Sequence, residues 1–150
     1  NQNAIVFGLD RADRFINSIF PSNLICARVE LTQLWKLLWE ERTRISKTYL
    51  LYPNPWPKSK HLKRRWYAHP AFKYLVKISE YLEIRTNWEI YALEAYFSLK
   101  MTTTNKTTLK HFIPNLPISL HEKKYFFSGH DLFKVTSSKK RSNSYLDMRR

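Results

Sequence analysis

The residues whose types and spacing could do chemistry are concentrated in one stretch of this chain, residues 49–65. An apolar run ends there at a turn with three alternating prolines, and Asn54 and Trp56 stand between them. Because proline fixes φ and lacks an N–H, this turn holds both side chains in set directions. A dense set of cations follows: Lys58, Lys60, His61, Lys63, Arg64 and Arg65. Such cations bind the phosphates of nucleic acids, so the stretch predicts a nucleic-acid site beside a small-molecule crevice.

Two acidic residues follow apolar runs near the start of the chain. Asp10 follows residues 4–9, and Glu30 closely follows residues 24–27. Ligands of open α/β sheets bind at the carboxyl ends of the strands, where an acid can accept from ribose hydroxyls. Alternatives stay open, because Asp10 could cap a following helix and Glu30 could be a solvated turn residue.

The elements that must position these residues alternate between apolar runs and helical stripes. Continuous apolar runs predict buried strands, and apolar residues at helical spacing predict the helices between them. We expect strands at 4–9, 24–27, 47–52, 82–85, 107–113 and 131–135, and helices at 11–20, 31–40, 70–81, 86–99 and 119–127. This order predicts a doubly wound α/β domain, with a mostly parallel sheet and helices on both faces.

The overall composition narrows the class of protein. A formal net charge of +14 indicates a polyanionic partner, and 43% apolar residues argue against a disordered chain. No run reaches the roughly 18 apolar residues of a membrane span, and the start shows no secretory signal. The single cysteine suits a reducing compartment, so we expect a cytoplasmic protein. The spacing of histidines predicts no metal site, and two glycines cannot build a Gly-rich loop.

Three motifs resemble one known family. The stretch YPNPWPKSKHLKRR is similar to the signature of the bacterial tRNA (guanine-N7)-methyltransferases, whose usual form is F-x-P-D-P-W-x-K-x-R-H-x-K-R-R. Thr86-Asn87-Trp88 with Tyr91 resembles the family's T-D-W-x-x-Y. Ser119-Leu120-His121-Glu122, followed by Gly129-His130, resembles its T-x-F-E with a downstream G-H. The resemblance covers roughly residues 4–136, and the long signature is the specific part.

The resemblance implies a Rossmann-like class I methyltransferase domain at residues 1–136, followed by a basic flexible tail at 137–150. Its implied cofactor is S-adenosyl-L-methionine, held by Asp10, Glu30 and Asn54, and its implied partner is tRNA. Asn54 is also the implied catalytic residue. The implied RNA contacts are Lys58, Lys60, His61, Lys63, Arg64, Arg65, Asn87, Ser119 and Glu122. The family's first strand and Gly-rich loop are expected to precede residue 1, so the sheet would lack an inner strand.

The chemistry implied by the resemblance needs alignment rather than a base. Guanine N7 has a lone pair and no proton, so the protein's task is to orient the reactants and stabilise the positive charge that appears. Two family aspartates are amides here, Asn54 and Asn87. Losing one preorganised charge costs about 10² to 10³ in rate, so we expect weakened or absent activity.

Several of these positions have a purely structural alternative. Asn54 could make an Asx turn, and Asn87 could be no more than a helix start, where Thr86-Asn87-Trp88-Glu89 fits a capping box. Ser119 with Glu122 also has the capping-box pattern. The cations could form a solvated loop.

Two other classes of function stay open. The chain could be an RNA-binding remnant without catalysis, or a subunit that a second chain completes. We expect a monomer or homodimer, with no membrane partner and no metal.

Overall fold

The structure is a computed structural model of the 150-residue chain, and it describes residues 4–10 and 21–139. The helix expected at 11–20 and most of the expected tail lie outside the described residues. The first described elements are two short strands, β1 (Val6–Asp10) and β2 (Leu24–Arg28), which pair in parallel. A side chain at Gly8 would come within 2.9 Å of Cys26 Sγ, so glycine permits the close approach of the two strands.

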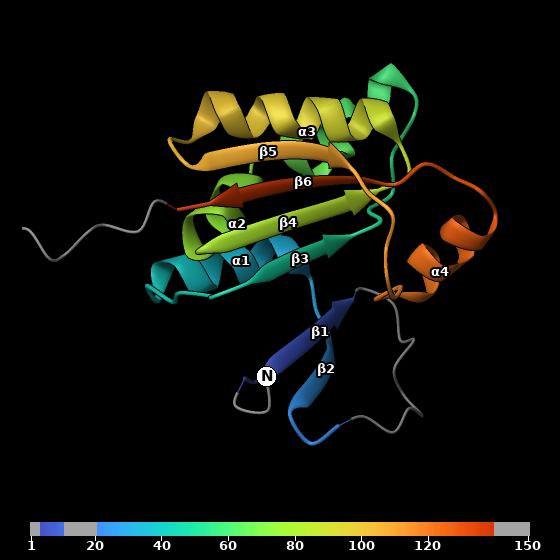
Figure 1. The fold of residues 1–150 in the computed structure, drawn as a ribbon. Coiled ribbons are helices and arrows are strands. Elements are labelled where there is room, and N and C mark those ends of the chain that lie inside the picture. Colours follow the sequence, from blue (N-terminus) through green and yellow to red (C-terminus); the bar gives the residue numbers. More distant parts are fainter. Residues whose placement is uncertain (1–3, 11–20, 140–150) are drawn as a thin grey trace, which may run out of the picture.

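A second, four-stranded sheet forms the body of the molecule (Figure 1). Its strands are β3 (Thr48–Leu51), β4 (Tyr81–Thr86), β5 (Lys106–His111) and β6 (Phe133–Ser138), in the spatial order β3-β4-β6-β5. β3 and β4 are parallel, and β6 runs antiparallel to both of its neighbours. Three of the four strands therefore point the same way, in agreement with the predicted mostly parallel sheet.

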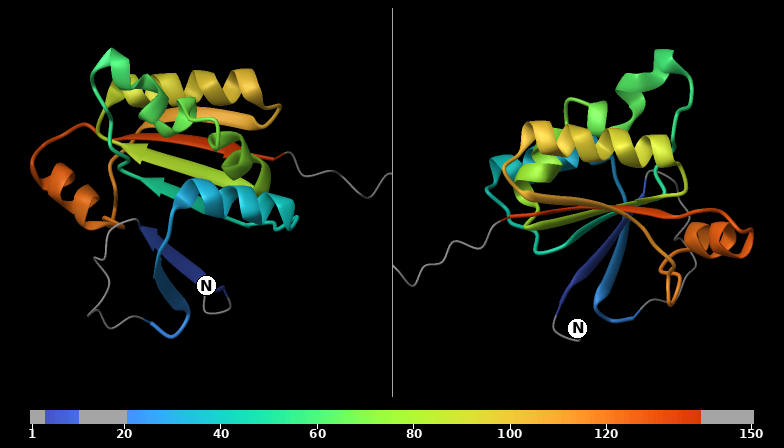
Figure 2. Two further views of the ribbon diagram at one scale, coloured as in Figure 1. Left: turned by 180° about the vertical axis from the view of Figure 1, so that it is seen from behind. Right: turned by 45° about the horizontal axis from the view of Figure 1, so that its top comes forward.

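Three helices cover one face of this sheet, as both views in Figure 2 show. They are α1 (Leu31–Glu40), α2 (Phe72–Ile78) and α3 (Glu89–Thr102). Two short 3₁₀ helices, η1 (Ser59–Arg64) and η2 (Trp66–Ala68), lie in the connection from β3 to α2. A single core cluster joins them to the sheet through side chains such as Trp35, Leu75, Tyr91 and Ile84. Helices were expected on both faces; among the described helices, these three share one face, and the opposite face carries a row of charged side chains.

The two sheets are separate, and the break falls between β1 and β3. Within the described residues, β1 pairs with β2 alone and β3 pairs with β4 alone. Apolar side chains of the first sheet are exposed, including Val6, Phe7 and Ile25.

Some predicted boundaries were wrong for identifiable reasons. The helix expected at 86–99 begins at Glu89, because Thr86 is the last residue of β4 and is buried there. The Thr86 hydroxyl accepts from the Trp88 N–H at 3.1 Å, so the expected capping box does not form. The strand expected at 131–135 runs instead from Phe133 to Ser138, because buried Ser137 pairs with Leu82 in the sheet.

Candidate functional site

The site is built at the carboxyl ends of β3 and β4, which we call the carboxyl edge. Because these strands are parallel neighbours, the residues that follow them emerge at the same edge. Asn54 follows β3 and is exposed, and Asn87 follows β4 and is half-buried. Helix α4 (Leu120–Phe127) lies at this end of the sheet (Figure 1). The fold thus brings Asn54, Asn87 and the α4 segment to one edge.

The proline-rich turn starts and ends on strained residues. Tyr52 has φ +48° and Trp56 has φ +45°, a left-handed conformation that non-glycine residues rarely adopt. Each such residue costs on the order of 1–3 kcal/mol unless its surroundings hold it. Between them, Asn54 Oδ1 accepts from the Trp56 N–H at 3.5 Å, which is the Asx-turn alternative weighed for Asn54. The turn therefore needs external contacts to keep its shape.

Arg65 supplies those contacts from the end of the basic segment. Its guanidinium donates to the carbonyls of Trp56 at 3.1 Å and Pro57 at 3.3 Å. It also donates to the Tyr67 hydroxyl and to the Glu94 carboxylate on α3. Arg65 is 8% exposed, so the structure does not fit its expected role as an RNA contact. It instead fastens the turn to the helix layer.

The same anchor shifts two pKa values. The hydrogen bond that Arg65 donates to the Tyr67 hydroxyl raises the pKa of Arg65, against the opposing effect of burial. Burial and the hydrogen bond to Glu94 raise the pKa of Tyr67 to about 12. At neutral pH the anchor therefore holds a charged guanidinium and a neutral phenol, the combination its hydrogen bonds require.

The remaining cations of the basic segment are on the surface. Lys58, Lys60, Lys63 and Arg64 are exposed, and His61 is half-buried. The Arg64 guanidinium lies 4.8 Å from the centre of the Trp56 ring, and the His61 ring meets the same indole edge-on at 5.3 Å. η1 thus presents a cationic surface stiffened by an aromatic ring, next to the turn that carries Asn54.

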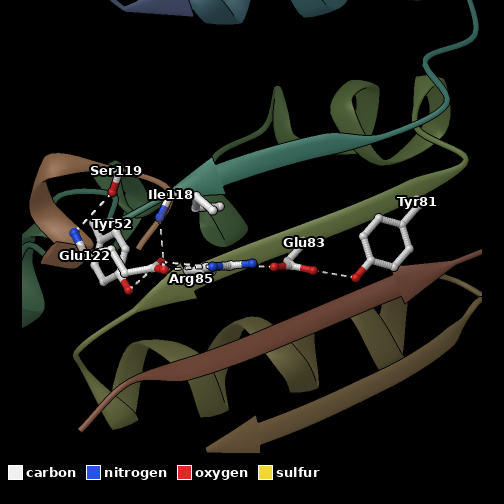
Figure 3. A network of polar contacts seen from close by, with 7 residues as sticks. All are labelled: Tyr52, Tyr81, Glu83, Arg85, Ile118, Ser119 and Glu122. Carbon is white, nitrogen blue, oxygen red and sulfur yellow. Dashed lines mark hydrogen bonds and ion pairs between the residues drawn. The ribbon is translucent and has the colours of Figure 1, made fainter. Parts of the chain in front are cut away.

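Glu122 is the second anchor of the edge, and it is fully buried. Figure 3 shows the polar contacts that surround it. Its carboxylate accepts from Arg85 Nη1 at 2.9 and 3.1 Å, from the Tyr52 hydroxyl at 2.9 Å, and from the Ile118 N–H at 3.4 Å. No surface is left for the expected contact with RNA. Burial and the hydrogen bond to Glu122 raise the pKa of Tyr52, so its hydroxyl stays a donor. The Glu122 carboxylate thus connects α4 to Tyr52, the strained residue that starts the proline-rich turn.

A row of charges continues this anchor along β4 (Figure 3). Arg85 Nε donates to Glu83 at 2.6 Å, and the Tyr81 hydroxyl donates to the same carboxylate at 2.5 Å. Hydrogen bonds to Glu83 and Glu122 raise the pKa of Arg85 although burial opposes them. Sequence reasoning missed Arg85 and Tyr52. The alternation of Glu83 and Arg85 with apolar residues inside a strand was the signal that could have found this row.

Both ends of α4 are capped. The Ser119 hydroxyl accepts from the Glu122 N–H at 3.1 Å, so Ser119 is the N-cap residue, as its structural alternative predicted. At the other end Gly129 has φ +73°, and the His130 N–H donates to the Tyr125 carbonyl at 3.0 Å. This is a Schellman ending, which needs glycine at that position. It returns the chain so that His130 Nδ1 lies 3.3 Å from Asn87 Nδ2.

Asp10 and Glu30 stand apart from these groups, on the first sheet. Asp10 is the last residue of β1, and its carbonyl accepts from the Val29 N–H at 3.0 Å. Glu30 precedes α1, and its carboxylate accepts from the Thr32 hydroxyl at 3.1 Å. Because β1 and β2 are parallel, the structure brings the two acids to the carboxyl end of one strand pair.

In the part of the chain that the structure describes, no group of three or more His, Cys, Asp or Glu side chains could hold a metal ion. Residues 4–10 and 21–139 also contain no helix that is long and apolar enough to cross a membrane.

Comparison with known proteins gives one family and several partial relatives. The family model Methyltransf_4, described as "Putative methyltransferase", matches residues 8–135. The tRNA (guanine-N(7)-)-methyltransferase of Ralstonia pickettii is 31% identical over 98 residues, which are 61% of this chain and 38% of that protein. The protein of the same name from Chromohalobacter salexigens is 49% identical over 47 residues, 29% of this chain and 19% of that protein.

One solved structure has the same fold at low identity. It is titled "Crystal structure of SMU.776, a putative methyltransferase complexed with SAH". Its TM-score is 0.54 at 10% identity, and the match covers 87% of this chain and 38% of that one. This likeness shows the fold. The chain spans about two fifths of the length of the Ralstonia relative.

Proposed function

Because the chain belongs to the Methyltransf_4 family, whose model it matches over residues 8–135, we propose that it contributes to methylating N7 of a guanine in tRNA. The observation that carries the proposal is the arrangement of the carboxyl edge. There a cationic 3₁₀ helix follows a strained proline turn, and two side-chain amides emerge from neighbouring parallel strands. The partial relatives from Ralstonia pickettii and Chromohalobacter salexigens are named for this reaction.

The cofactor of the proposed reaction is S-adenosyl-L-methionine, and the described residues fit one end of it. Asp10 and Glu30 place two carboxylates at the carboxyl end of a parallel strand pair, where acids accept from ribose hydroxyls and amino groups. With two glycines in the chain, residues 1–150 offer no Gly-rich loop for the rest of the cofactor. Asp10 and Glu30 would therefore hold the adenosine end.

When bound, this cofactor supplies a methyl group activated by a sulfonium. Guanine N7 has a lone pair and no proton, so no residue of this chain would need to act as a base, and the methylated purine would carry a positive charge. The task of the chain is to orient the base and hold its edge. Asn54 and Asn87 provide amide oxygens that can accept from guanine N–H groups, without the charge that a carboxylate would add.

The proposed RNA contacts are the exposed part of the basic segment. Lys58, Lys60, Lys63 and Arg64 are the phosphate contacts, with His61 beside them. Their geometry suits recognition of RNA backbone and shape, with one guanine turned out to the carboxyl edge. Arg65 and Glu122 act as positioning residues, because both are buried and both hold the turn that carries Asn54.

The experiment is a methyl-transfer assay on unmodified tRNA with labelled cofactor, followed by mapping of 7-methylguanine. We expect weak turnover by the natural sequence, and a rise of about 10² in the Asn54→Asp variant, since a carboxylate restores the missing charge. Asn105→Asp is the matched control, because Asn105 bonds to Ser137 away from the carboxyl edge. Undiminished turnover by the natural sequence would refute the predicted weakening.

The second candidate function is RNA binding without catalysis, which the two amides and the Asx contact of Asn54 favour. It predicts salt-dependent tRNA binding together with no methyl transfer, even in the Asn54→Asp variant. If the chain does not bind tRNA at all, both candidate functions are wrong.

A further inference from the structure

Four aromatic rings gather at the carboxyl edge, and the function proposed above leaves them unused. Tyr125 on α4 is the centre of this ring cluster, which consists of Tyr52, His121, Tyr125 and His130. Its ring centroid lies 5.5 Å from that of Tyr52, 5.3 Å from His130 and 6.4 Å from His121. The two histidines are exposed, while Tyr125 and Tyr52 are half-buried. The cluster thus presents ring surface to solvent on a partly buried base.

The ring cluster is held rigidly from three sides. The Tyr52 hydroxyl is fixed by the buried Glu122 carboxylate at 2.9 Å. The Glu122 N–H donates to the Ser119 hydroxyl, and this N-cap fixes the start of α4, the helix that carries Tyr125 and His121. The Schellman ending at Gly129 then folds His130 back against Tyr125. Aromatic rings fixed in this way lose little entropy when a planar ligand stacks on them.

The ring cluster is also next to groups that can read a base. Asn87 Nδ2 lies 3.3 Å from His130 Nδ1, and Tyr52 is two residues before Asn54. A planar ring that stacked on the cluster would therefore have amide groups within the same edge. This combination of aromatic faces with a few placed polar groups is typical of a nucleobase site.

We propose that the ring cluster is the stacking wall for the methylated purine, and that it favours the cationic 7-methylguanine over guanine. The proposal rests on the proposed function, and it names the side chains that stabilise the positive charge of the methylated base. The faces of tyrosine rings attract cations, and such attraction strengthens where water is excluded. The protein has a net charge of +14, and the two edge positions, Asn54 and Asn87, are amides rather than carboxylates. The ring faces are therefore the groups of this site that attract a positively charged base.

The test compares two nucleotides on the full chain, 7-methyl-GMP and GMP, by equilibrium dialysis at 150 mM salt. Both carry the same phosphate, so attraction to the basic surface cancels in the ratio of their dissociation constants. We expect 7-methyl-GMP to bind about 5- to 30-fold more tightly. Equal affinity for the two nucleotides overturns the proposal.

Substitutions in the ring cluster test whether these rings cause the preference for 7-methyl-GMP over GMP. Tyr125→Phe keeps the ring and should keep the preference, whereas Tyr125→Ala should reduce the ratio to about one. Phe127→Ala is the matched control, because Phe127 is on the same helix, is 73% exposed and lies outside the cluster. Circular dichroism checks the folding of each variant. If Tyr125→Ala does not fold, His130→Ala is used, and it should lower the ratio at least threefold.

The outcome separates this inference from the proposed function. A preference that disappears in Tyr125→Ala or His130→Ala supports the stacking wall even if no methyl transfer to tRNA is found. A preference that survives both changes, or that Phe127→Ala also abolishes, overturns the stacking wall while leaving the methylation assay to judge the function.

Discussion

Two adjacent arginines, Arg64 and Arg65, should respond to the same substitution in opposite ways. Arg64 is exposed and stacks on Trp56, whereas Arg65 is 8% exposed and donates to four groups. Replacing either with methionine keeps the apolar stem and removes the guanidinium. The pair therefore provides its own matched control for the difference between an RNA contact and an internal anchor.

The loss of stability in Arg65→Met can be worked from its contacts. Removing one partner of a buried ion pair costs about 3–5 kcal/mol. The Glu94 side chain is 41% exposed and can be resolvated, so the lower end applies, about 3 kcal/mol. For a domain of this size each kcal/mol lowers Tm by roughly 3 °C, which predicts a fall of about 10 °C. Arg64→Met should change Tm by less than about 2 °C, because surface changes cost little.

Binding of tRNA should show the reverse. Each phosphate contact contributes about 0.7 to 0.9 to the slope of log K against log salt. Arg64→Met should therefore reduce the slope by about that amount, and Arg65→Met should leave it unchanged below its melting temperature. Calorimetric Tm and filter binding across salt concentrations make the two measurements. If Arg65→Met lowers the slope and leaves Tm unaltered, the anchor interpretation is wrong.

Three further predictions concern stability. Glu122→Ala should cost about 3–5 kcal/mol in urea unfolding, because Arg85 keeps Glu83 but loses its second carboxylate, and the Tyr52 hydroxyl loses its acceptor; a loss below 1 kcal/mol would contradict the buried anchor. Amides of β1 and β2 should exchange with solvent faster than those of β4, because a two-stranded pair is marginally stable; equal protection would mean that the first sheet is better supported than its exposed side chains indicate. The raised pKa of Tyr67, about 12, stabilises the fold fully below pH 10, and this contribution is lost as the pH rises through 12. Tyr67→Phe should therefore weaken the fall in stability between pH 9 and pH 12, and an identical fall in both proteins would exclude Tyr67 as its source.

Local pattern was sufficient for most of the elements. Helix α1 has the predicted bounds, since its apolar stripe is long and regular. The strands β1, β2, β3 and β4 fall within a residue or two of their apolar runs. The start of α3 was misplaced because Thr86, which looks like a helix cap in sequence, is buried at the end of a strand. A cap and a strand end use the same residue types, so local sequence does not distinguish them.

The sequence by itself determined the chemistry available: a proline turn, a run of cations, and amides after two strands that had to be parallel. Only the tertiary structure decided which of those groups meet solvent. Arg65 and Glu122 have the residue types of surface contacts, yet both are buried as anchors of the turn. The reason is physical: the energy of a charge depends on its partners, and Glu94 and Arg85 approach from elements distant in the chain.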